Sequence, residues 1–64
     1  MTIIDDLKAI NKDIAKEQDL YKRNNKAKYW YVKLQNIYPD YNFTILYAGN
    51  YPYKILASVK ESIL

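Results

Sequence analysis

The chain has 64 residues, half of them hydrophobic and eight of them tyrosines, and it carries a formal net charge of +3. It contains no cysteine and no histidine, which excludes disulfide bonds and the usual structural zinc sites. Because it has only one glycine and two prolines, the composition predicts a single small globular domain over residues 1–64 rather than a disordered chain.

The first segment is predicted to form an amphipathic helix. Its apolar stripe repeats at helical spacing and consists of Ile3, Leu7, Ile10, Ile14 and Tyr21. Thr2 followed by Asp5 resembles a capping box, so the helix is expected to begin near residue 2. Glu17 interrupts the stripe and marks a bend or a break in packing. Asn24-Asn25 is the predicted end of the helix, because asparagine tolerates the left-handed conformation found after many helices.

From Lys28 onward the chain is rich in aromatic and β-branched residues, which favour strands. Strands are predicted at 29–35, 42–48 and 53–59, and the first shows apolar residues at every second position. Residues suited to turns, Pro39-Asp40 and Gly49-Asn50, separate the three runs. The expected fold class is therefore α+β, an N-terminal amphipathic helix packed on a small antiparallel meander of two or three strands.

Two of these runs also fit a helix. One helical face would contain Ala27, Trp30, Tyr31, Leu34 and Ile37. Pro52 suits a first helical turn, and the apolar residues after it would give a short C-terminal helix. Only 42–48 reads clearly as a strand, and because a strand needs a neighbour, at least one other run is expected to be extended. Residues 26–38 and 52–64 stay open between strand and helix.

The sequence also indicates self-association. On the meander face turned away from the helix, Leu46 and Leu56 are uncovered in a monomer. They are expected to lie beneath residues 61–64 or in a dimer contact. The apolar positions of the first helix are close to a heptad repeat and offer a second way to form a homodimer.

Residues that carry catalysis are scarce. Without Cys or His, most nucleophile and base arrangements are missing, and a single glycine excludes a phosphate-binding glycine loop. The prediction is a protein that is not an enzyme, with no catalytic residue, metal or cofactor. No run approaches the roughly 20 apolar residues that cross a bilayer, and Asp5 and Asp6 replace the positive charge of a signal peptide. A cytoplasmic location with no membrane contact is expected.

Residues 21–33 contain five basic residues and no acid, mixed with tyrosine and tryptophan. Such a mixture attracts phosphates and stacks on unpaired bases, so it predicts a nucleic-acid site. The alternative is that Trp30 belongs to the core, the tyrosines fill the sheet and the lysines keep the protein soluble. The candidate residues for binding a partner or nucleic acid are Lys22, Arg23, Lys26, Lys28, Tyr29, Tyr31, Lys33 and Lys54.

Eight tyrosines exceed what so small a core can hide, and exposed tyrosine and tryptophan are typical of protein interfaces. The preferred hypothesis is a small binding protein that acts through a protein partner as an inhibitor or adaptor. Nucleic-acid binding through residues 21–33 is the alternative. Richness in Lys, Ile, Asn and Tyr indicates an A+T-rich coding genome, which is compatible with a phage or viral protein acting in the host cytoplasm.

Overall fold

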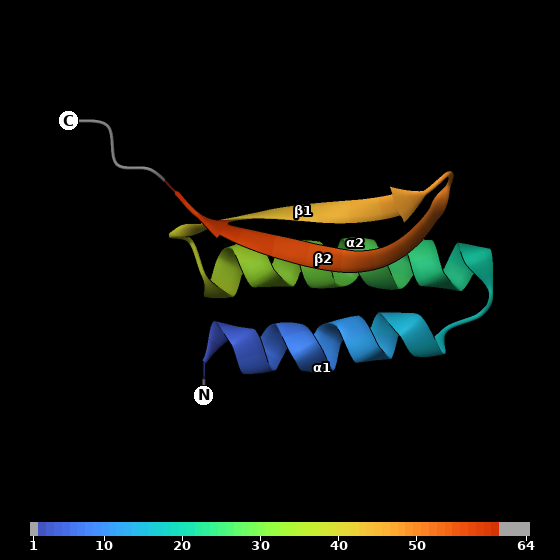
Figure 1. The fold of residues 1–64 in the computed structure, drawn as a ribbon, viewed down its shortest axis with the longest axis horizontal. Coiled ribbons are helices and arrows are strands. Elements are labelled where there is room, and N and C mark those ends of the chain that lie inside the picture. The colour runs from blue at the N-terminus through green and yellow to red at the C-terminus, as the bar shows by residue number, and fades with distance from the viewer. Residues whose placement is uncertain (1, 61–64) are drawn as a thin grey trace.

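The computed structural model describes residues 2–60 and contains two helices followed by a β-hairpin (Figure 1). The elements are α1 (Ile3–Lys16), α2 (Leu20–Ile37), β1 (Tyr41–Ala48) and β2 (Tyr51–Val59). The predicted α+β class is confirmed, with a helix packed on a small antiparallel sheet. The sheet has two strands, and a second helix takes the place of the first predicted strand.

Helix α1 begins where the sequence predicts. The side chain of Thr2 accepts a hydrogen bond from the Asp5 backbone N–H at 3.3 Å and so caps the helix. The helix ends at Lys16, well before the asparagine pair, because Glu17 adopts an extended conformation. Ile10 and Ile14 are buried, so the apolar stripe of α1 belongs to the core of the same chain.

Helix α2 shows that the predicted strand at 29–35 and the predicted helix end at Asn24-Asn25 are wrong, and it confirms the alternative of a helix over the first of the two open runs. The Asp19 side chain caps this helix by accepting from the Lys22 N–H at 2.9 Å. Leu34, seven residues after a buried alanine at position 27, is buried on the same helical face. Val32, which an alternating strand would bury, is 55% exposed. The helical spacing therefore decides which side chains reach the core.

The two strands pair antiparallel, with Ile45 opposite Ile55 at the centre. The predicted strands at 42–48 and 53–59 are confirmed, as is the turn between them. Gly49 has a φ of +67° and no other residue in the described chain has a positive φ, which matches a type II′ turn with glycine first. The alternative of a helix from Pro52 is wrong over 52–59. Its end at 61–64 lies outside the described residues.

A β-bulge lies next to the turn. Leu46 pairs with Lys54, whereas Tyr47 pairs with Pro52, so Tyr53 is the extra residue on β2. The other predicted turn, at 39–40, is present but connects α2 to β1 instead of joining two strands.

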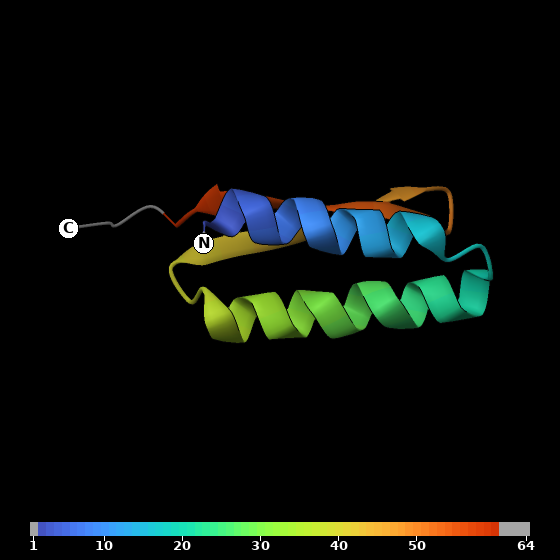
Figure 2. The same ribbon diagram turned by 90° about the horizontal axis from the view of Figure 1, so that it is seen from below.

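Helix α2 packs across one face of the hairpin and contacts both strands. Helix α1 runs alongside β2 on the side away from β1 (Figure 1), and Figure 2 shows it level with the hairpin, with α2 below. In the described part of the chain, α1 packs against β2 and α2 but not against β1. The core lies where these elements meet and consists of Ile10, Ile14, Ala27, Leu34, Phe43 and Ile55.

The face of the hairpin turned away from the helices is open. Thr44 and Leu56 form one cross-strand pair on this face, and both are exposed. Leu46 is half-buried there and pairs with the exposed Lys54. For the described residues, the predicted uncovered position is therefore confirmed for Leu56, whereas Leu46 is only partly uncovered. The segment expected to cover them, 61–64, lies outside that range.

Candidate functional site

Seven of the eight candidate residues lie on α2, and the eighth, Lys54, lies on β2. Lys54 is exposed on the open face of the hairpin, whereas α2 packs on the opposite face. Tyr31 is half-buried and packs against the core. Lys54 therefore does not share a surface with the exposed lysines of α2, and Tyr31 contributes mainly to the core.

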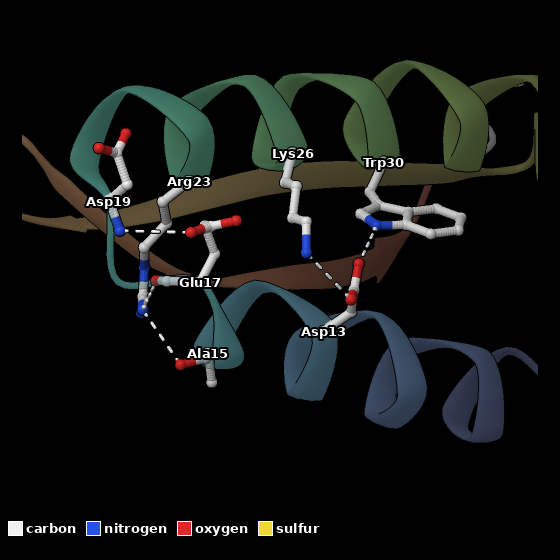
Figure 3. A network of polar contacts seen from close by, with 7 residues as sticks. All are labelled: Asp13, Ala15, Glu17, Asp19, Arg23, Lys26 and Trp30. Carbon is white, nitrogen blue, oxygen red and sulfur yellow. Dashed lines mark hydrogen bonds and ion pairs between the residues drawn. The ribbon is translucent and has the colours of Figure 1, made fainter.

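Arg23 is buried, with 6% of its surface exposed, and it joins three elements. Its Nη1 donates to the backbone carbonyls of Ala15 at 3.4 Å and Glu17 at 3.0 Å, at the C-terminal end of α1 (Figure 3). Its Nε donates to the Pro52 carbonyl at the start of β2. The guanidinium also lies 4.2 Å from the ring centroid of Tyr51. Its positive charge is well placed for the negative end of the α1 dipole, so Arg23 is a structural residue.

Lys26 forms an ion pair with a residue of α1. Its Nζ lies 3.2 Å from Oδ1 of Asp13, whose other oxygen accepts from the Trp30 indole at 3.1 Å (Figure 3). The Trp30 hydrogen bond first, and that of Lys26 second, lower the pKa of Asp13 below its usual 3.8. This ion pair connects the two helices and takes Lys26 away from an external ligand.

The remaining candidates on α2, together with the exposed Tyr21 and Val32, form a surface on the outward side of this helix. We call it the outward α2 surface, and it consists of Tyr21, Lys22, Lys28, Tyr29, Val32 and Lys33. Tyr29 and Lys33 are four residues apart on one helical face, and the Lys33 Nζ lies 3.2 Å from the Tyr29 hydroxyl. The apolar side chains are well exposed, 77% for Tyr21, 56% for Tyr29 and 55% for Val32. No acidic residue occurs in α2, so this surface is positively charged.

Two shallow depressions border the helices. One has a volume of about 330 Å³ and lies at the first half of the outward α2 surface, lined by Glu17, Lys22, Asn25, Lys26 and Tyr29. The other has a volume of about 230 Å³ and lies between α1 and α2, lined by Asp6, Ala9, Ile10, Trp30, Leu34 and Ile37. At one end of the second, the hydroxyl of Tyr38 donates to Asp6, which raises the pKa of Tyr38 above 10.0.

The sequence did not reveal the role of Asn11. Its side-chain N–H donates to the Ile55 carbonyl at 3.1 Å, and its oxygen accepts from the Ile55 backbone N–H at 2.8 Å. The two residues are 44 positions apart, so no local pattern indicates the contact. The carboxamide of Asn11 therefore occupies the outer edge of β2 as a neighbouring strand would.

Within residues 2–60 there is no group of three or more His, Cys, Asp or Glu side chains arranged to hold a metal ion. Neither of the described helices has the length and apolar character needed to cross a bilayer. Comparison of the chain with protein-family models, with curated proteins and with solved structures finds no match.

Proposed function

We propose that this chain is a non-enzymatic binding protein, an inhibitor or adaptor that docks onto another protein through the outward α2 surface. Its place of action would be the cytoplasm, that of the host if the chain is a phage or viral protein. The observation that carries the proposal is the exposure of Tyr21, Tyr29 and Val32 on a helix with no acidic residue.

The chemistry of the surface indicates the chemistry of the partner. Large aromatic side chains with a polar tip contribute much of the energy of protein interfaces, and they contribute most where a partner excludes water from them. Lys22, Lys28 and Lys33 are exposed beside them. A complementary partner would have an apolar centre with acidic residues around it.

Nucleic-acid binding is the second candidate function. Fewer side chains are available for it in the folded chain than the sequence alone indicates. Of the five basic residues in 21–33, Arg23 bonds to backbone carbonyls and Lys26 pairs with Asp13. Three exposed lysines remain to contact phosphates, and each neutralised phosphate adds to the salt dependence of binding. The aromatic residue best suited to stacking, Trp30, is half-buried and donates its indole N–H to α1.

The experiment is affinity capture from an extract of cells that express the chain, with matched variants. The double substitution Tyr29→Ser and Val32→Ser removes the apolar centre of the outward α2 surface. The control, Tyr53→Ser and Leu56→Ser, removes similarly exposed side chains from β2. We expect a protein that the wild type and the control retain and that the α2 variant loses, because only that variant removes the docking contacts.

A parallel titration with labelled single- and double-stranded DNA and RNA, across a salt series, separates the two candidates. Nucleic-acid binding that weakens steeply with salt and disappears on replacing Lys22, Lys28 and Lys33 with alanine would replace the proposal. A captured protein that both double variants retain equally would refute the assignment to α2.

A further inference from the structure

The two outer edges of the hairpin differ in whether their backbone N–H and C=O groups have hydrogen-bond partners. In an antiparallel pair, successive residues of a strand direct their N–H and C=O alternately toward and away from the partner. The Lys60 N–H donates to the Asp40 carbonyl at 3.1 Å, so residues 42, 44 and 46 of β1 face β2. The N–H and C=O groups of Phe43 and Ile45 therefore point outward, away from β2.

The outer edge of β2 is protected in several ways. The Asn11 carboxamide bonds both outward groups of Ile55. The bulge at Tyr53, together with Pro52 and the exposed Lys54, interrupts the rest of the edge. Bulges, prolines, lysines and covering segments are the features by which proteins prevent strands from pairing further.

Within the part of the chain that the structure describes, the outer edge of β1 has none of these features. Strand β1 contains eight residues with no charged side chain, no proline and no extra bulge residue. Among residues 2–60, no element lies beyond β1 on the side away from β2 (Figure 1). Among residues 2–60, no side chain or strand hydrogen-bonds to the outward groups of Phe43 and Ile45. This edge is a template for one more strand.

We propose that β1 pairs antiparallel with β1 of a second copy, so that two chains share a continuous four-stranded sheet. A second copy suits this edge because β1 carries no charged side chain, so no like charges would lie opposite each other where two β1 strands pair. The contact is the same surface on both chains, as a two-fold axis requires.

The position of the helices leaves this arrangement open. Helix α2 packs on one face of the hairpin, behind β2 in Figure 1, so it does not cover the outer edge of β1. Two hairpins joined edge to edge would place their α2 helices on the same face of the shared sheet, on either side of the two-fold axis. The α2 flank on the side away from α1 contains Asn24, Tyr31 and Gln35, with the exposed Lys28 at its outer margin.

The test removes one hydrogen-bond donor from each chain without changing a side chain. A chemically synthesised chain with an N-methyl group on the Ile45 amide cannot donate across the β1 edge, whereas its bonds to β2 stay intact because this N–H points outward. The matched control carries the N-methyl group on Val59, whose N–H points outward from β2. We expect the wild type and the Val59 control to sediment at twice the chain mass of 7.6 kDa, and the Ile45 variant at the single mass.

Hydrogen exchange of the wild type tests the same contact without a variant. In the pair, the Phe43 and Ile45 amides should exchange at least about tenfold more slowly than in the dilute single chain. A wild-type chain that stays at 7.6 kDa up to millimolar concentration would overturn the proposal. A dimer in which these two amides exchange freely, or one that N-methylation of Ile45 leaves intact, would also overturn it.

Discussion

The carboxylate of Asp13, on α1, contacts two side chains of α2, so its charge state affects the packing of the two helices. The Trp30 indole and the Lys26 ammonium both donate to this carboxylate. The lowered pKa of Asp13 means that the folded chain keeps this group ionised more readily than the unfolded chain does. The contacts therefore stabilise the fold at neutral pH, and their contribution is lost as the pH falls from 3.8 through the lowered pKa.

Replacing Asp13 with asparagine should remove this pH dependence. Asparagine keeps an acceptor for the Trp30 indole but does not titrate. In urea unfolding at about pH 6 and about pH 3, the free energy of unfolding of the wild type should fall more than that of Asp13→Asn. Parallel losses in the two proteins would show that the carboxylate contributes nothing. Because Asp13 is more than a third exposed, the difference is expected to be small and reduced by salt.

Residues also differ in how far their roles can be seen in the sequence. Thr2 and Gly49 act through neighbours within three residues, and both roles were predicted correctly from local patterns. The sequence places Arg23 among the candidate binding residues, but its bond to Pro52 crosses 29 positions and depends on the tertiary structure. The candidate surface was therefore predicted in part, with Lys22, Lys28, Tyr29 and Lys33 exposed on one helix.

At the scale of elements, the preferred strand at 29–35 is the main error, and the alternative of a helix over the same run is confirmed. The aromatic and β-branched residues of this run favour strands intrinsically, and Trp30, Val32 and Leu34 alternate as a strand would. Burial at helical spacing overrides that local preference, because α2 covers both strands of the hairpin. The hairpin itself was predicted, since the Gly49-Asn50 pair lies between two runs of strand residues.

Asn11 connects two elements, α1 and β2, and its removal should loosen the contact between them. Asn11→Ala leaves the N–H and C=O of Ile55 without partners in the protein, which should cost about 1–2 kcal/mol of unfolding free energy. The control is Lys12→Ala, the next residue on the same helix, which is exposed.

Urea unfolding measures the cost, and hydrogen exchange at the Ile55 amide locates it. We expect faster exchange there in Asn11→Ala and little change in Lys12→Ala. An Asn11→Ala protein as stable as the control would mean that water replaces the carboxamide without cost.

At the scale of the whole molecule, Arg23 holds the ends of three elements together. A chain of this size has a total stability of roughly 3–5 kcal/mol, so one buried contact is a large part of it. Arg23→Lys keeps the charge but cannot reach the carbonyls of Glu17 and Pro52 at once or stack on Tyr51 in the same way. We expect a loss of roughly 2 kcal/mol.

The adjacent residue supplies the control for Arg23. Lys22 is exposed, and Lys22→Ala should change the unfolding free energy by no more than about 0.5 kcal/mol. Urea midpoints with unchanged slopes would measure both effects. If Arg23→Lys matches Lys22→Ala, the guanidinium does not join the three elements as its contacts indicate.

The carboxamide of Asn11 has a consequence for the size of any assembly that the chain forms. A sheet with two open edges recruits strands at both ends and grows into a filament. Here the β2 edge is terminated from within by a side chain of α1, so each chain has one edge to offer. The proposed pairing through β1 would consume that edge in both copies, and the assembly would be closed after a single step.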